Sequence, residues 1–228
     1  MRTAFFVDGY NLYYGALHAS PYKWLDLPKL LKTILHIQDP TATVASIAYY
    51  TAPVIARLAT RGQASNDAQS RYIRALQARD VEVTLGSHRL APSFAPRYVD
   101  GQKASRTDRV PIWLLEEKQT DVNVALGMYR TACRAEQLGI DQIVLVSGDT
   151  DLAPALAAIR GDFPQMHLGV ILPHRGERSE IVREPPGSLQ KHADWMRRYI
   201  SDEEMEACQL PPKVPLPRKP AIVKPDYW

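Results

Sequence analysis

Short apolar runs alternate with amphipathic stretches along most of this chain. Runs that are almost entirely apolar or β-branched predict buried strands at 3–7, 43–50, 81–85, 143–146 and 167–172. Apolar residues at helical spacing predict helices at 25–37, 53–78, 120–136 and 151–159, the second of them broken near Gly62. Strands that alternate with helices indicate an α/β fold, in which a mostly parallel sheet is covered by helices on both faces.

Two segments depart from this alternation. Residues 86–117 contain prolines, aromatic residues and a turn signal at Asp100-Gly101, which together predict a β-hairpin-like insertion. Residues 211–228 include six prolines, so we expect an extended Pro-rich tail without a helix or strand, anchored by burial of the Trp228 indole. The expected organisation is one domain at 1–200, with the insertion at about 86–117, and then a C-terminal segment at 201–228 that holds the tail.

Three acidic motifs stand near the points where apolar runs stop. They are FFVDGYN at 5–11, KQTDVN at 118–123 and VLVSGDTD at 144–151. The carboxyl ends of the strands in an open α/β sheet form its functional edge. We therefore expect four carboxylates, those of Asp8, Asp121, Asp149 and Asp151, to converge at that edge.

Helix capping offers an alternative explanation for the first motif. Asp8 could cap the helix that follows its strand, and Asn11 could cap a helix that starts near Leu12. Read alone, this motif is as consistent with a cap as with a ligand-binding carboxylate.

Capping also offers an explanation for the other two motifs. Thr120 or Asp121 is a natural N-cap, and after the Gly148 turn one aspartate of the pair Asp149 and Asp151 could cap the next helix. A cap accounts for one member of that pair but not for both. Three motifs on one predicted edge are therefore better explained by a shared site than by independent caps.

The residue types at this site predict a divalent cation. Converging carboxylates repel one another unless a cation lies among them. Oxygen ligands suit Mg²⁺ or Mn²⁺ rather than zinc. The six histidines show no metal-ligand spacing, the two cysteines are expected to be free thiols, and Ser147 has no nearby His–Asp pair to make it a nucleophile.

The formal net charge of +3 is unevenly distributed. The tail from residue 211 carries four basic residues and one acid, so the rest of the chain is neutral overall. Basic residues concentrate at 57–79 and 89–109, and the second stretch holds Arg89, Arg97, Lys103, Arg106 and Arg109. Basic surface beside an acidic site suits a metal centre that acts on a polyanion, although each stretch could also be an ordinary solvated face.

No apolar run reaches the ~18 residues expected of a membrane span. The N-terminal apolar stretch is short and is interrupted by Asp8, unlike a signal peptide. We therefore expect a cytoplasmic protein without membrane partners.

The three acidic motifs also resemble the signature blocks of a known family. FFVDGYN at 5–11, EEKQTDVNVA at 116–125 and VSGDTDLAP at 146–154 are similar to those of the NYN-domain family, which belongs to the PIN-like nucleases. The similarity extends over about residues 1–200 in the order and spacing of elements. It implies a PIN-like, Rossmann-like three-layer fold and an Mg²⁺- or Mn²⁺-dependent nuclease, most often an endoribonuclease that acts on RNA.

The resemblance assigns roles by position in the motifs. Asp8, Asp121, Asp149 and Asp151 match the acidic residues that bind metal and carry catalysis, and Asn11 and Ser147 match the polar supports. We add as candidates for support or substrate binding Asn123, Thr150, Arg89, Arg106 and Lys118. The basic hairpin would hold the RNA backbone, and one of Tyr10, Tyr13 and Tyr14 could stack on a base.

One departure from the family pattern keeps a second function open. Gly127 stands where many members have a further aspartate. A catalytically weak RNA-binding, regulatory or protein-interaction module on the same fold is therefore the alternative, and its Pro-rich tail could bind a protein partner or mediate self-association. A phosphatase of the haloacid dehalogenase type needs a second aspartate two residues after Asp8, where this chain has Tyr10.

Overall fold

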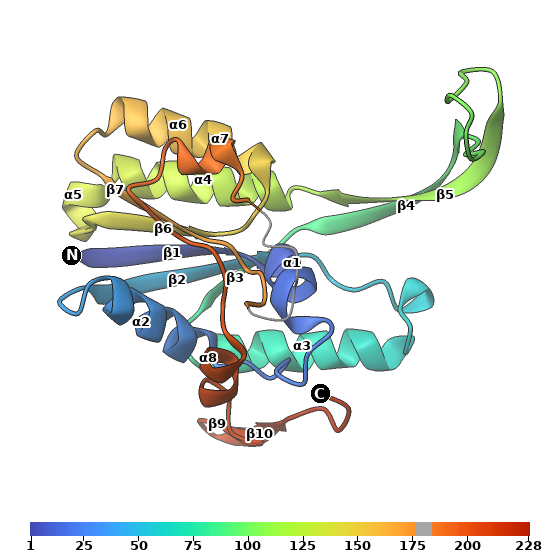
Figure 1. The fold of residues 1–228 in the computed structure, drawn as a ribbon. Helices are drawn as coiled ribbons and strands as arrows, with labels where there is room; N and C mark the ends of the chain where they lie inside the picture. The colour runs from blue at the N-terminus through green and yellow to red at the C-terminus, as the bar shows by residue number, and fades with distance from the viewer. Residues whose placement is uncertain (177–183) are drawn as a thin grey trace.

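A parallel β-sheet forms the centre of the molecule. The computed structural model describes residues 1–176 and 184–228. Within them, six strands pair in the order β3-β2-β1-β6-β7-β8, and every neighbouring pair is parallel (Figure 1). The strands are β1 (Arg2–Asp8), β2 (Thr43–Thr51), β3 (Glu82–Leu85), β6 (Gln142–Val146), β7 (His167–Ile171) and β8 (Trp195–Arg197). The predicted α/β class and mostly parallel sheet are therefore confirmed.

The strand order reverses direction at β1. The chain moves outward from β1 through β2 to β3, and then returns to place β6 on the other side of β1. Ligands of open α/β sheets bind beyond the carboxyl ends of the strands at such a switch point. The first and third acidic motifs follow β1 and β6, so the topology brings them to this place.

Helices cover both faces of the sheet. The main ones are α2 (Leu27–Gln38), α3 (Gln63–Gln77), α4 (Thr120–Cys133) and α6 (Ala153–Asp162). Figure 1 shows α4 and α6 on one face and α2 and α3 on the other. Successive side chains of a strand point to opposite faces, so in β1 Ala4 and Phe6 join the core under α4 and α6, while Phe5 and Val7 join the core on the side of α2.

Helix α2 begins as the sequence predicts. The Asp26 carboxylate caps it by accepting a hydrogen bond from the Lys29 backbone N–H at 3.2 Å, and a proline stands in the first turn. Its leucines and Ile34 are buried. The shorter helical elements are α1 (Gly9–Leu12), η1 (Tyr13–Leu17), η2 (Ala56–Leu58), α5 (Ala135–Leu138), η3 (Thr150–Leu152), α7 (Gly187–Gln190) and α8 (Asp202–Ala207).

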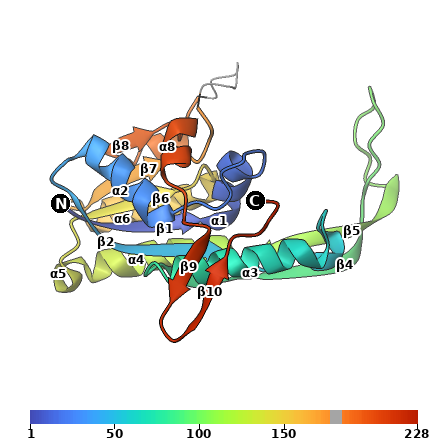
Figure 2. The same cartoon turned by 90° about the horizontal axis from the view of Figure 1, so that it is seen from below.

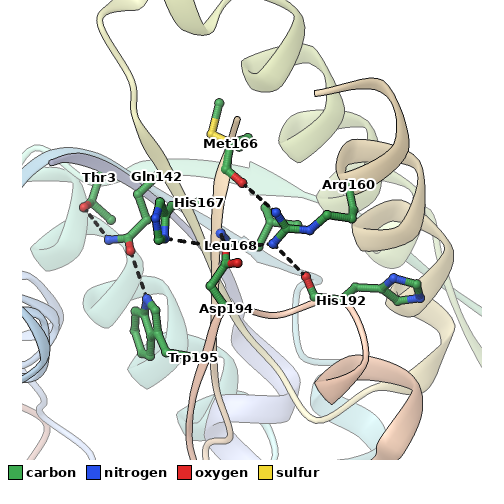
Figure 3. Close-up of polar contacts among 9 residues, drawn as sticks. All are labelled: Thr3, Gln142, Arg160, Met166, His167, Leu168, His192, Asp194 and Trp195. Atoms are coloured by element: carbon green, nitrogen blue, oxygen red, sulfur yellow. Dashed lines mark hydrogen bonds and ion pairs between the residues drawn. The ribbon is translucent and has the colours of Figure 1, made fainter. Parts of the chain in front are cut away.

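Strand β8, which the sequence pattern did not predict, is held at the sheet edge by polar side chains. Figure 3 shows Asp194 beside β7, where its carboxylate accepts hydrogen bonds of 2.7 Å from the Leu168 backbone and from Arg160. The next residue, Trp195, donates its indole N–H to Gln142 at 2.9 Å. The Arg160 guanidinium also contacts the carbonyls of Met166 and His192. These bonds compensate for the shortness of the strand.

Strands β4 (Ser87–Pro96) and β5 (Arg109–Lys118) pair antiparallel as a ribbon. Figures 1 and 2 show this ribbon projecting from the body, and it starts at the edge of the sheet where α1 lies. The ribbon occupies the segment at about 86–117 for which the sequence predicts a β-hairpin-like insertion. Large apolar side chains remain exposed on it, including Phe94 and Trp113.

The prediction that the tail lacks a strand is wrong. Strands β9 (Lys213–Leu216) and β10 (Lys219–Val223) form an antiparallel hairpin, with Arg218 in the left-handed region at the turn. Prolines are compatible with this short hairpin because it is not part of a central sheet. Trp228 packs against Trp24 and Tyr72, with ring centroids 6.2 and 5.6 Å away, as expected for an anchoring indole.

Among the described residues, no helix is long and apolar enough to cross a membrane.

Candidate metal centre

Asp8 is buried at the end of β1 and is held by two donors. One carboxylate oxygen accepts the Asn11 backbone N–H at 2.9 Å, so Asp8 is the N-cap of α1. The other oxygen accepts the Ser147 hydroxyl at 3.0 Å. The idea that Asn11 caps a helix starting near Leu12 is therefore wrong, because the helix starts at Gly9, directly after β1, and its N-cap is Asp8.

Ser147 and Asn11 join the first and third motifs. The Ser147 hydroxyl donates to Asp8 and accepts the Asp149 backbone N–H at 3.0 Å. The Asn11 side-chain oxygen accepts the Gly148 backbone N–H at 2.9 Å. These bonds connect positions about 140 residues apart and fix the direction in which each acidic side chain leaves the backbone.

Asp121 lies in the first turn of α4 without acting as its cap. The N-cap is Gln119, which has a φ of 78° and makes no side-chain capping bond. The expectation that Thr120 or Asp121 caps this helix is therefore wrong. The Thr120 hydroxyl is instead buried against Gly86 and has no hydrogen-bond partner among the described residues. This leaves the Asp121 carboxylate available for the site.

Three carboxylates meet at the switch point. One oxygen atom from each of Asp8, Asp121 and Asp149 lies within 4.8 Å of the others. No lysine or arginine among the described residues forms an ion pair with any of them. The donors are all carboxylate oxygens, which is the ligand type that Mg²⁺ and Mn²⁺ prefer.

Burial and mutual repulsion both disfavour charge at this cluster. Burial, with smaller contributions from Asp121 and Glu117, raises the pKa of Asp8 to about 6, against the opposing effect of its two hydrogen bonds. Burial also raises the pKa of Asp121, and the nearby Asp149, Glu117 and Asp151 add to the shift. A bound divalent cation would reverse both effects, so the residues present fit such an ion.

Asp151 stands outside the group of three. It is exposed in the first turn of η3, and its backbone N–H donates to the Asp149 carboxylate at 2.9 Å. Asp149 is therefore the N-cap of η3 as well as a member of the cluster. Asp151 remains close enough to raise the pKa of Asp121, which places it at the rim of the site.

The other candidate residues lie farther out. Thr150 is exposed next to Asp149, and Asn123 lines a separate groove together with Tyr50 and Gly127. Lys118 pairs with Glu116 at 3.2 Å on the ribbon. Arg89 lies on β4, and Arg106 lies in the loop that joins the ribbon strands. The structure therefore groups the acidic residues and places the basic ones along the ribbon.

Glu117 is a further acidic residue near the cluster that is not among the candidates predicted from the sequence. It lies near the end of β5 and contributes to the raised pKa of Asp8 and Asp121. It belongs to the polar run at 116–121, which was the feature of the sequence that could have identified it. Alternate residues of a strand point to opposite sides, so the sequence alone could not show whether Glu116 or Glu117 lies on the side of the cluster. The pairing register of the ribbon was needed to decide this.

Gly127 has a packing reason that the sequence could not show. A Cβ at this position would overlap the Tyr50 hydroxyl and would lie 3.3 Å from Phe6. Tyr50 lies on β2, opposite Asp8 in the register of β1 and β2, and burial raises the pKa of its phenol to about 12. The phenol therefore occupies the space that the side chain of a family-type aspartate would need.

We expect Gly127→Ala to destabilise the protein by about 1 kcal/mol. Overpacking costs about 1–3 kcal/mol, which exceeds the gain of about 1 kcal/mol in helix propensity. In a Tyr50→Phe background the same substitution should be neutral or stabilising, because the overlapping oxygen is gone. Urea unfolding of the four proteins measures this coupling. Stabilisation by Gly127→Ala in the wild-type background would contradict the packing explanation.

The fold and the site define a class: an α/β protein with a cluster of three carboxylates, able to hold a cation, at the switch point of a parallel sheet. The NYN domain profile matches residues 2–180, and the chain belongs to the NYN-domain family.

One curated relative and one solved structure illustrate the range of this similarity. The relative is 6-hydroxy-3-succinoylpyridine 3-monooxygenase HspA of Pseudomonas putida, 36% identical over 247 aligned positions that span all of this chain and 75% of the relative. The structure is of a protein of unknown function from Vibrio parahaemolyticus, with 18% identity and a TM-score of 0.51. It covers 92% of this chain and 96% of its own, and at this identity it shows only a shared fold.

Proposed function

We propose that this protein is a divalent-metal-dependent nuclease, and specifically an endoribonuclease that hydrolyses phosphodiester bonds. The observation that carries the proposal is the convergence of Asp8, Asp121 and Asp149 within 4.8 Å at the switch point. Membership of the NYN-domain family, within the PIN-like nucleases, supports the same reaction.

Each acidic residue has a role in this proposal. Asp8, Asp121 and Asp149 would hold Mg²⁺ or Mn²⁺, with Asp151 at the rim. The bound ion would supply a water of lowered pKa and neutralise charge on the scissile phosphate. Ser147 donates to Asp8 and so keeps one carboxylate oxygen oriented. Because the pKa of Asp8 is about 6 without metal, ion binding would displace a proton at acidic pH.

The ribbon is the proposed support for RNA. Arg89, Lys103 and Arg106 form no ion pair within the described part of the chain, whereas Arg97 pairs with Asp108 at 3.1 Å. Tyr98 is 86% exposed near the ribbon tip. Unpaired cations beside exposed aromatic rings suit a single strand, whose backbone is held by charge and whose bases stack.

We expect the triple substitution of Arg89, Lys103 and Arg106 by glutamine to weaken RNA binding uniformly across sequences. Each lost phosphate contact reduces the slope of log K against log salt by about 1, so the triple variant should lower it by up to about 3. Filter binding in EDTA measures the slope. A matched control replaces Lys213, Arg218 and Lys219 of the tail hairpin, and an equal change in that control would contradict the role of the ribbon.

The proposed reaction is tested by incubating end-labelled structured RNA with the protein in Mn²⁺, Mg²⁺ or EDTA. Metal-dependent internal cuts are expected, and parallel single-stranded DNA measures the preference for RNA. RNA binding without cleavage in any metal would favour the weakly catalytic or regulatory alternative. If the protein neither binds nor cleaves RNA, both the nuclease function and the regulatory alternative are contradicted.

A second candidate function is oxygenation of a hydroxylated pyridine. It is favoured by the 36% identity to a 6-hydroxy-3-succinoylpyridine 3-monooxygenase over the whole chain. A monooxygenase transfers one oxygen atom of O₂ to its substrate and reduces the other to water with two electrons from an added reductant. Consumption of 6-hydroxy-3-succinoylpyridine that requires both O₂ and an added reductant would support this function, and no such consumption would leave hydrolysis as the activity.

A further inference from the structure

A cavity of about 270 Å³ lies beside the acidic cluster, and tyrosines form much of its wall. Tyr10 and Tyr14 enter it from the α1–η1 segment with their rings stacked, 5.9 Å apart at 23°. The His88 ring meets Tyr10 edge-on at 5.6 Å from the base of the ribbon. Flat rings with this spacing provide a stacking surface for another flat ring.

One cation lines this aromatic cavity. Lys23 is half-buried and forms no ion pair or hydrogen bond with the described residues. An ammonium group in the wall of a cavity that is otherwise rich in aromatic rings attracts an anionic group of a ligand or the face of its ring. The other long polar side chain there, Gln69, already bonds the backbone of Ala52 and Val54. Lys23 is therefore the group left to recognise a charged ligand.

The cavity adjoins the candidate metal centre through Gly9. Gly9 joins Asp8 of the cluster to Tyr10 of the cavity wall. A Cβ at Gly9 would lie 2.6 Å from the Tyr49 hydroxyl, so this buried phenol rests directly against the backbone next to Asp8. A ligand in the cavity would thus lie close to the acidic cluster.

The C-terminal residues complete the wall on the far side. Tyr227 donates its hydroxyl to the Ala64 carbonyl at 2.7 Å, and the Arg61 guanidinium lies 4.5 Å from the centre of its ring. Trp228 lines the same cavity. The tail therefore contributes to the cavity rather than leaving it as an open surface.

We infer that this cavity binds one flat heteroaromatic ring that carries an anionic group, and that it selects the substrate of the adjacent site. A cavity of about 150 Å³ accommodates benzene, so 270 Å³ accommodates one substituted ring. The ring stacks on Tyr10 and Tyr14, and its anionic group pairs with Lys23. The inference deepens the proposed function, since the ring is either a base of the nucleic acid or a free hydroxypyridine acid.

The test is calorimetric titration of the full chain in EDTA with UMP, AMP and 6-hydroxynicotinate. Saturable binding of at least one probe is expected, and its identity separates the two sources of the ring. Tyr14→Ala should lower the affinity for that probe about tenfold. Lys23→Met should lower the affinity for UMP but not the affinity for the neutral nucleoside uridine.

Two further variants keep this test independent of folding and of catalysis. Ser65→Phe places a ring inside the cavity and should abolish binding, whereas Ser70→Phe on the exposed side of the same helix should not. Asp149→Asn should bind the probes like the wild type, so a failure of the proposed hydrolysis leaves this result unaffected. Absence of saturable binding, or equal binding by Ser65→Phe and Ser70→Phe with both proteins folded, would overturn the inference.

Discussion

Asp149→Asn is expected to lower metal-dependent RNA cleavage at least a hundredfold. Asp149 contributes one of the three oxygen atoms that lie within 4.8 Å of one another. A metal ion stabilises transition-state charge by several kcal/mol, and each 1.36 kcal/mol corresponds to a factor of ten in rate. Initial rates at a fixed Mn²⁺ concentration measure the effect, and a higher Mn²⁺ concentration should restore part of the activity.

The asparagine variant is chosen because it preserves the local fold. Its amide oxygen can still accept the Asp151 backbone N–H that caps η3. Asp67→Asn is the matched control, because Asp67 is exposed on α3 and bonds only Gln63 among the described residues. Wild-type cleavage by Asp149→Asn would remove the metal-site mechanism. Equal loss in Asp67→Asn would point to a general effect of the substitution.

The central sheet was predictable because its strands carry a strong local signal. The apolar runs that became β1, β6 and β7 are buried on both faces, so most residues in them are apolar, and the second half of β2 is mostly buried as well. The same signal placed Asp8 and Asp149 at strand ends. β8 was missed because it spans only Trp195–Arg197 and depends on bonds from Asp194 and Trp195 to other elements.

The surroundings of the site required tertiary information. The tyrosine-lined cavity combines residues from Gly9 to Trp228, and no local pattern connects them. Gly127 looked like a lost ligand, but its position is explained by Tyr50, which lies on a different element. Conversely, aspartate and threonine are common N-cap residues, so the sequence favoured a cap at Thr120 or Asp121. The structure has the cap at Gln119 instead, because the chain leaves the ribbon there in a left-handed conformation.

Asp8→Asn is expected to stabilise the metal-free protein at neutral pH. The folded pKa of Asp8 is about 6, against about 3.9 for an unfolded aspartate. Between these values the folded state binds a proton that the unfolded state has released, so stability falls as pH rises from about 4 to about 6 and is constant above. The ionised carboxylate thus lowers the free energy of unfolding by about 3 kcal/mol at pH 7.

The asparagine removes this charge but loses one acceptor for the Ser147 hydroxyl, which costs about 1 kcal/mol. The net gain is therefore about 2 kcal/mol, or a rise in Tm of roughly 4–8 °C for a chain of this size. Thermal unfolding in EDTA from pH 4 to 8 measures it, and the variant should lose the part of the pH dependence that comes from Asp8, while the part that comes from Asp121 remains. Mn²⁺ should stabilise the wild type and have little effect on the variant, because ion binding to the folded state alone shifts the unfolding equilibrium. A variant less stable than the wild type at pH 7 in EDTA would show that Asp8 is a structural cap first, and that charge repulsion at the cluster is weak.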